Sequence, residues 1–322
     1  MGSPTSETGR GNFEGEHNVS LTKGFYLGKY EVTQEQWFAI MGTSISHFSG
    51  NKLPVEKVSW LDAVSFCQQL TQSEQDAGRL PSGWAYALPT ESQWEYACRA
   101  GTATVFAYGN SLSSSHANFD GTQPYGGASS GANIGQTSNV GSYSPNPWGF
   151  FDMHGNVWEW CSDWFVDYPS GSVSDPMGPS TGTKRINRGG SWSNAGGGLR
   201  AAWRNRTDPN PRINDVGFRL AYRQITTPPG NLVSTAPLTI AENQPIGTVV
   251  GEFNATDPDV NATLTYQFVS GAGDTHNTLF TLETNGTLKT VTTFDYESNV
   301  STYSIRVQAK DEFNATWKGT SQ

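Results

Sequence analysis

Residues 152–161 read Asp-Met-His-Gly-Asn-Val-Trp-Glu-Trp-Cys. Asp152 and Glu159 lie seven residues apart, and Gly155 between them indicates a turn. Calcium binds about six to eight hard oxygen ligands and mixes carboxylates with backbone carbonyls, so this spacing predicts a calcium site. The alternative is a surface turn whose acids are merely solvated.

The chain of 322 residues is too long for one typical domain, and its composition changes near residue 224. Ten of the eleven tryptophans and all three cysteines precede that point. Residues 1–224 hold 16 Lys+Arg and 19 Asp+Glu (net −3), and residues 225–322 hold 4 and 10 (net −6). We therefore expect two domains and no nucleic-acid partner.

No apolar run approaches the roughly 18 residues of a membrane helix, so no membrane insertion is expected in this segment. No signal peptide is visible, and the second domain looks unfinished at its C-terminal end. We expect a fragment of a longer chain. Cys67, Cys98 and Cys161 form no CxxC pair, and each is predicted to be a buried small hydrophobic residue.

Capping patterns predict three helices in the first domain. They begin at residues 33–36, 59–62 and 90–93, and helical apolar spacing follows the last two. Residues 108–147 carry almost no periodic signal. So long an irregular stretch indicates organisation by ions or function.

Several sequence blocks occur in a fixed order around residues 152–161. They are Gly-Phe-Tyr-Leu-Gly-Lys-Tyr-Glu-Val-Thr (24–33), Pro-Val-Glu-Lys-Val-Ser-Trp (54–60), Leu-Pro-Thr-Glu-Ser-Gln-Trp-Glu-Tyr-Ala-Cys-Arg-Ala-Gly (88–101), Arg-Gly-Gly-Ser-Trp (188–192) and Gly-Phe-Arg (217–219). Residues 1–224 resemble the formylglycine-generating enzyme (sulfatase-modifying factor) family. The resemblance implies an α+β C-type-lectin-like domain with little regular secondary structure, flanking helices and bound Ca²⁺.

Members of the family that make formylglycine use a pair of cysteines after the Gly-Gly-Ser block. Here that loop reads Trp-Ser-Asn-Ala-Gly-Gly-Gly-Leu over residues 192–199, and no cysteine follows Cys161. Only a thiolate is soft enough to hold Cu(I) and nucleophilic enough to engage a substrate thiol. Leu199 also stands where relatives often carry a structural cysteine, the usual partner of Cys98. We therefore expect no formylglycine generation.

Other branches of the superfamily are non-haem iron enzymes, which need clustered histidines. The five histidines of this chain form no HxH motif or i,i+4 pair, so no iron site is predicted.

The resemblance also assigns calcium ligands. At the first site they are the side chains of Asp152 and Glu159 with the carbonyls of Gly155 and Val157. A second family site would use Asn118 and the carbonyl of Phe119. Its expected carboxylate falls near Ala132, which cannot be a ligand, although Asn133 is adjacent.

The family's substrate cleft would be floored by residues 192–206, where a protein, peptide or glycan ligand is expected. The candidate ligand-binding residues are Trp192, Ser193, Asn194, Trp203, Arg204 and Arg206. Aromatic and arginine side chains commonly anchor recognition surfaces. The alternative places both tryptophans in the core and pairs both arginines with acids.

Residues 225–235 have the composition of a linker. Alternating strands are then predicted at 238–241, 247–253, 264–268, 280–282, 288–290 and 303–309, which indicates a β-sandwich. Residues 236–322 resemble a cadherin repeat through Ala-Glu-Asn-Gln-Pro (241–245), Thr-Asp-Pro-Asp (256–259), Phe-Asp-Tyr-Glu (294–297) and Val-Gln-Ala-Lys-Asp (307–311). This implies an all-β Greek-key sandwich whose neighbours are further repeats or domains.

In cadherins the matching acids bind calcium between consecutive repeats. The resemblance assigns this role to Glu242, Asp257, Asp259, Asp295 and Glu297. The alternative is that acids in β-turns are merely solvated.

The leading interpretation is a non-catalytic, calcium-stabilised extracellular binding and adhesion module, secreted or displayed at the cell surface. Two rivals remain open. One is an oxidoreductase acting on a thiol or peptide by a cysteine-independent route. The other is a structural spacer within a large surface protein.

Overall fold

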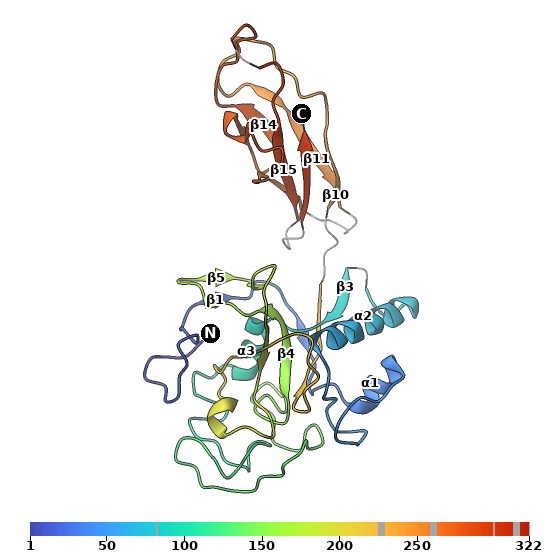
Figure 1. Ribbon diagram of the computed structural model, residues 1–322, viewed down its shortest axis with the longest axis vertical. Coiled ribbons are helices and arrows are strands. Elements are labelled where there is room, and N and C mark those ends of the chain that lie inside the picture. The colour runs from blue at the N-terminus through green and yellow to red at the C-terminus, as the bar shows by residue number, and fades with distance from the viewer. Residues whose placement is uncertain (82, 225–228, 258–262, 299, 312–315, 322) are drawn as a thin grey trace. The chain divides into compact units, whose positions relative to one another are not determined.

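The computed structural model describes residues 1–81, 83–224, 229–257, 263–298, 300–311 and 316–321 (Figure 1). The chain divides into two compact units, Met1–Arg223 and Gln224–Gln322. They are called the first and second unit below.

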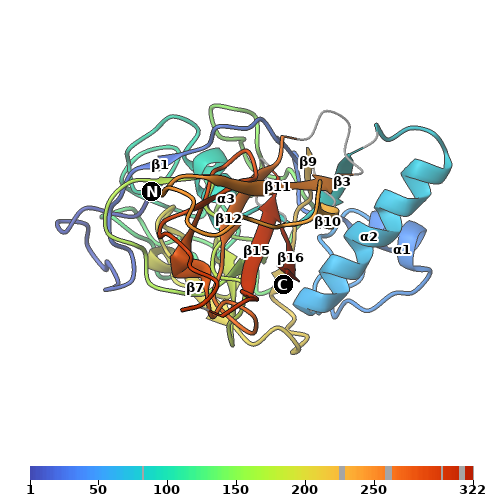
Figure 2. The ribbon, with the colours of Figure 1, turned by 90° about the horizontal axis from the view of Figure 1, so that it is seen from above.

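Three α-helices of the first unit begin where their capping sequences predict. They are α1 (Gln34–Met41), α2 (Trp60–Asp76) and α3 (Glu91–Arg99). Each has a complete capping box, in which the N-cap hydroxyl accepts from the N3 amide and the N3 side chain accepts from the N-cap amide. Helices α1 and α2 lie side by side, as both ribbon views show (Figures 1 and 2).

The strands of the first unit are short and form three small sheets. The largest has the order β7-β6-β4-β8 and contains β4 (Trp158–Trp164), β6 (Arg185–Arg188), β7 (Asn205–Thr207) and β8 (Val216–Gly217). The second has the order β2-β9-β3, with β2 (Tyr26–Leu27), β3 (Trp84–Ala87) and β9 (Ala221–Gln224). Strands β1 (Val19–Ser20) and β5 (Val173–Ser174) pair in parallel.

The core of the first unit lies between these elements. One cluster joins Trp37 of α1 and Phe66 of α2 to Trp160 of β4. Another joins Trp94 and Cys98 of α3 to Cys161 of β4. Residues 108–147 contain no helix and no multi-residue strand, as the missing periodicity predicts. The block of residues 152–161 thus leads from this irregular region into the central strand β4.

The described residues of the second unit form two sheets. One has the order β10-β11-β14-β13, from β10 (Gly230–Ser234), β11 (Val249–Thr256), β13 (Phe280–Leu282) and β14 (Thr287–Thr290). The other has the order β12-β15-β16, from β12 (Thr265–Phe268), β15 (Ile305–Lys310) and β16 (Thr316–Ser321). The Greek-key connection remains a prediction.

Two local expectations for the second unit are wrong. Residues 230–234, expected within the linker, form β10 and pair with β11. Hydrogen bonding to β11 thus determines their structure more than their local composition does. Residues 238–241, expected as a strand, have no regular structure. Their Leu238 and Ile240 side chains nevertheless pack against the core, which explains the strand-like alternation.

Candidate functional site

The carboxylate of Glu159 lies at the centre of the first unit and is fully buried. Its two oxygens accept hydrogen bonds from the Arg219 guanidinium, Nε to Oε2 and Nη2 to Oε1, each at 2.6 Å. The indole of Trp94 donates to Oε2, also at 2.6 Å. Glu159, expected as a calcium ligand, is therefore already held by Arg219 and Trp94.

Two further carboxyl groups lie close to this ion pair. Burial, reinforced by the charges of Asp152 and Glu159, raises the pKa of Glu31 well above its ordinary value. Burial likewise raises the pKa of Asp152 to about 6, against the lowering effects of the Gly141 amide and Arg219. Three carboxyl groups thus share one arginine, so this centre carries excess negative charge unless it binds protons or a cation.

The turn at residues 155–157 connects this acidic centre to its surroundings. The φ of Gly155 is +94°, and a Cβ there would collide with the Asn118 carbonyl oxygen, so only glycine fits. Both Asn156 and Val157 donate to Glu31, from the side chain at 2.9 Å and from the backbone at 3.3 Å. Glu31 is therefore the acid that contacts the turn directly.

The second predicted calcium site lies next to the first. The Asn118 amide donates to the Gln136 carbonyl at 2.9 Å and to the Asn156 Oδ1 at 3.1 Å. Its own Oδ1 is buried and has no hydrogen-bond partner among the described residues, and the Thr137 hydroxyl shares that property. Phe119 is buried beside them. Asn133 donates instead to Asp120, at 3.0 Å.

Residues 191–194, at the start of the loop expected to form the floor of the cleft, make a tight hydroxyl-rich turn. The Asn194 Oδ1 accepts from the amide and the hydroxyl of Ser191, at 2.9 and 2.7 Å. Exposed Ser193 donates to Asp215 at 3.2 Å. The Trp192 indole is partly exposed and packs edge-on against Phe48 with ring centroids 5.5 Å apart. This part of the loop presents an aromatic and polar surface.

Arg204 does not belong to that surface, which corrects the sequence-based expectation. Its side chain is 1% exposed and forms a two-point ion pair with Glu91, at 2.7 and 2.9 Å. The Tyr168 ring stacks on the guanidinium at 3.7 Å. Glu91 lies 113 positions before Arg204 in the chain. The residues near Arg204 in the sequence therefore do not indicate this ion pair.

The remaining predicted residues of the cleft have other neighbours. Trp203 is partly exposed and packs edge-on against Phe13, at 6.5 Å between centroids. Arg206 is exposed, and its guanidinium lies over the rings of Phe165 and Phe13 at 4.3 and 5.1 Å. Trp192 contacts Phe48, whereas Trp203 and Arg206 both contact Phe13, so the structure assigns them different surroundings.

All three thiols are buried and unpaired, as predicted. Burial raises the pKa of Cys67 and of Cys98 to about 12 and that of Cys161 well above its ordinary value. The Cys98 sulfur lies 3.5 Å from Nε2 of His154. Burial also lowers the pKa of His154 to about 4. Its imidazole is therefore neutral at neutral pH and does not stabilise a thiolate at Cys98.

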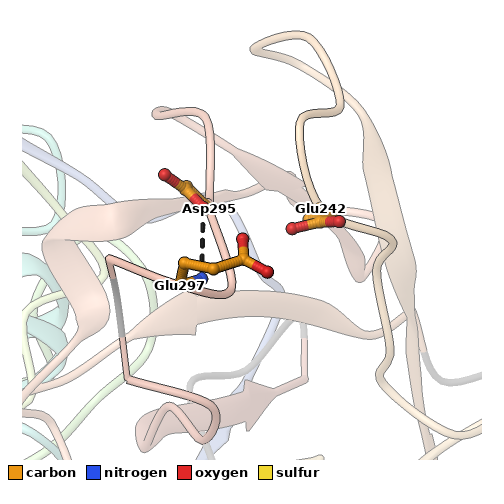
Figure 3. Close-up of side chains that lie close together, drawn as sticks. All are labelled: Glu242, Asp295 and Glu297. Atoms are coloured by element: carbon orange, nitrogen blue, oxygen red, sulfur yellow. Dashed lines mark hydrogen bonds between the residues drawn. The ribbon is translucent and has the colours of Figure 1, made fainter.

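The predicted acids of the second unit come together only in part. Ligand oxygens of Glu242, Asp295 and Glu297 all lie within 4.8 Å of one another (Figure 3). The Asp295 Oδ1 accepts from the Glu297 amide at 3.1 Å, and Glu242 accepts from the Tyr296 amide at 3.3 Å. Asp257 is half-buried and is not part of this group. Asp259 lies outside the described residues.

Sequence reasoning missed two acids near the predicted sites. Glu31 reaches the turn at residues 155–157 from more than a hundred positions away, and no spacing rule signals it. Glu56 lies near Asp215 and accepts from the Phe48 amide at 2.9 Å. Burial raises the pKa of Glu56 to about 7 despite that hydrogen bond. The sequence signal that could have indicated a buried Glu56 is its place between Val55 and Val58 in the block Pro-Val-Glu-Lys-Val.

The architecture of residues 1–224 and the arrangement of this site can be compared with known proteins. The family description "Sulfatase-modifying factor enzyme 1-like domain" matches residues 1–224, and "Cadherin domain" matches residues 236–322. The chain belongs to the sulfatase-modifying factor enzyme 1-like family.

Relatives extend over most of the first unit. The chaperone protein LppX of Paenibacillus barcinonensis is 31% identical over 239 residues, which is 64% of this chain and 82% of that protein. The formylglycine-generating enzyme of Mus musculus is 34% identical over 196 residues, 58% of this chain and 48% of the enzyme. The match thus spans about half of the mouse enzyme.

A solved structure supports the fold. Treponema denticola variable protein 1 superposes with a TM-score of 0.56 and 29% identity, covering 69% of this chain and 93% of that protein. The first unit therefore has the C-type-lectin-like fold expected from its sequence. No helix within the described ranges is long and apolar enough to cross a membrane.

Proposed function

We propose that the chain is a non-catalytic, calcium-stabilised extracellular ligand-binding and adhesion module. The observation that carries this proposal is the chemistry of residues 191–199, where the Ser191 hydroxyl hydrogen-bonds to Ser193 and to Asn194 and no thiol pair is present. The cysteines that the chain does possess are buried and held as neutral thiols.

The ligand surface proposed here is the exposed part of the 191–199 loop with its neighbours. Trp192 and Phe48 supply rigid aromatic area, and Ser193 with Asp215 supplies hydrogen-bonding groups. Rigid aromatic rings beside adaptable polar groups bind ligands at low cost in conformational entropy. A protein, peptide or glycan is the proposed class of ligand. Neighbouring repeats or domains of a longer chain would be additional partners of the second unit.

Two experiments test this function against its two rivals. A cysteine-containing sulfatase peptide, incubated with the full chain, copper and oxygen, should show no mass loss of the kind that accompanies conversion of a thiol to an aldehyde. On glycan and peptide arrays the chain should capture a ligand, and Trp192→Ala should weaken capture by at least about 1 kcal/mol. Conversion of the peptide above a control without protein would support the oxidoreductase instead. Failure to capture any ligand would favour the spacer.

Calcium is proposed at both units. In the first unit the excess of carboxylates around Asp152 and Glu31 fits a hard cation, with the carbonyls of Gly155 and Val157 nearby. Glu159 would contribute there through its charge, shared with Arg219. The buried Asn118 oxygen without a partner fits a second ion, beside the Phe119 carbonyl. In the second unit the fitting group is Glu242, Asp295 and Glu297. Asp257 and Asp259 are proposed as supporting ligands.

Removal of calcium should therefore lower the melting temperature of the first unit. Calcium at about a hundred times its dissociation constant stabilises by about 2.7 kcal/mol, which corresponds to roughly 5–10 °C for a unit of this size. Differential scanning fluorimetry with calcium and with EGTA measures the shift. Asp152→Asn should abolish most of it, whereas Asp208→Asn, at an exposed position, should leave it intact. Equal melting with and without calcium would refute calcium stabilisation.

A further inference from the structure

The second unit contains a cavity that neither family match assigns. Its volume is about 560 Å³, within the range of small-molecule sites. Its walls are mainly apolar and include Ile240, Phe280, Leu288, Phe294 and Ile305. Leu238 and Thr239, which do not form part of a strand, also line the cavity. The cavity therefore reaches from the surface to the core cluster of this unit.

Carboxylates mark one side of this cavity. Glu242 and Asp295 both line it, and Glu297 lies within 4.8 Å of them. Figure 3 shows Glu242 on one segment facing Asp295 and Glu297 on another. Asp295 accepts hydrogen bonds from the Ser298 hydroxyl at 2.7 Å and from the Glu297 amide at 3.1 Å. No lysine, arginine or histidine is among the described residues that line the cavity.

We propose that this cavity binds a small amphipathic cation, in which one ammonium group is joined to an apolar body. The body would replace water against Phe280, Phe294 and Leu288, and burial of apolar area is favourable. The ammonium group would lie at the rim between Glu242 and Asp295, where charge-assisted hydrogen bonds to carboxylates are strong. An anionic head would be repelled there, and a neutral head would gain no ion pair.

The charge series that tests this proposal keeps the apolar body constant. Isothermal titration of the full chain in EGTA should compare 4-phenylbutylamine, 4-phenylbutanol and 5-phenylpentanoate, which share a phenylbutyl group. The amine is expected to bind at least about tenfold tighter than the other two, because it alone can pair with the carboxylates at the rim. Equal affinity for all three ligands, or no binding of the amine, would overturn the proposal.

Variants separate the rim from the walls. The double variant Glu242→Gln/Asp295→Asn should remove the preference for the amine and leave the affinity for the alcohol within about twofold. Ile240→Trp should fill the cavity and weaken all three ligands. Glu283→Gln is the matched control, because Glu283 pairs with Lys289 and does not line the cavity. An amine preference that survives in the double variant would contradict the proposed role of these carboxylates.

The two proposals use the same carboxylates, so an ammonium group and a calcium ion would compete for Glu242 and Asp295, but each proposal can fail separately. The titrations contain no calcium, so amine binding does not depend on an ion at Glu242, Asp295 and Glu297. The calcium proposal is judged by the melting shift. A variant that fails to fold would be recognised by loss of the second unit's melting transition, and the charge series on the unmodified chain would still decide.

Discussion

Arg219→Ala should lower the free energy of unfolding of the first unit by about 3–5 kcal/mol, the usual cost of breaking a buried ion pair from one side. The Arg219 side chain is fully buried, and it also donates to the carbonyls of Gly28 and Phe151, at 3.0 and 2.9 Å. Its loss leaves Glu159 without a counter-ion beside Asp152 and Glu31. Urea unfolding followed by tryptophan fluorescence measures the change, because ten of the eleven tryptophans lie in this unit.

The matched control is Arg212→Ala. Arg212 pairs with Asp62 at 2.7 Å, but its side chain is 55% exposed. Exposed pairs contribute only about 0.2–1 kcal/mol, so this variant should unfold nearly as the unmodified chain does. Similar losses for the two arginines would mean that burial does not set the value of these pairs.

Asp163→Asn should stabilise the first unit by about 2–4 kcal/mol at pH 8 and change little near pH 4. Burial, followed by the charge of Glu91, raises the pKa of Asp163 to about 7, although hydrogen bonds from the Glu91 amide and Ser162 and the charge of Arg223 lower it. A difference of one pKa unit between the folded and unfolded states corresponds to about 1.4 kcal/mol in the free energy of unfolding.

The sign of this effect follows from proton binding. With a folded-state pKa of about 7, the folded state holds the Asp163 proton at pH values where the unfolded chain has already released it. Ionisation of Asp163 therefore costs stability as the pH rises from its ordinary pKa toward 7, and the cost is constant above that. Asparagine removes this cost. Urea unfolding at pH 4.5, 6 and 8 measures it, with exposed Asp167→Asn as the control. A gain independent of pH would refute the explanation.

The parts of the fold that depend on neighbouring residues could be predicted from the sequence. The capping boxes at Thr33, Ser59 and Thr90 act within four residues, and all three helices begin beside them. Strand β13 covers its predicted residues, 280–282. Its signals, alternating apolar residues and flanking turn residues, also lie within a few positions of the strand. The buried thiols followed from the general behaviour of unpaired cysteine.

The rest depends on residues that are far apart in the chain. Arg204 was interpreted as a surface anchor because its acid, Glu91, lies on α3. Glu31 was overlooked because the turn at residues 155–157 reaches it only in the folded state. Glu159 was assigned to calcium before the bidentate contact with Arg219 was visible. In each case the missing information was the identity of the partner that contacts the charged side chain in the folded protein. A single sequence does not reveal these partners.

The buried arginines also bear on how early the first unit can fold during synthesis. Arg200 closes an ion pair with Glu14, 186 positions earlier, and Arg204 donates to the carbonyl of Phe13 at 3.0 Å. When residues 1–150 have left the ribosome, Glu14 and Glu91 are already synthesised, but the arginines that pair with them are not. Such non-local pairing slows folding. The nascent first unit should therefore remain protease-sensitive until the segment through Arg219 has emerged.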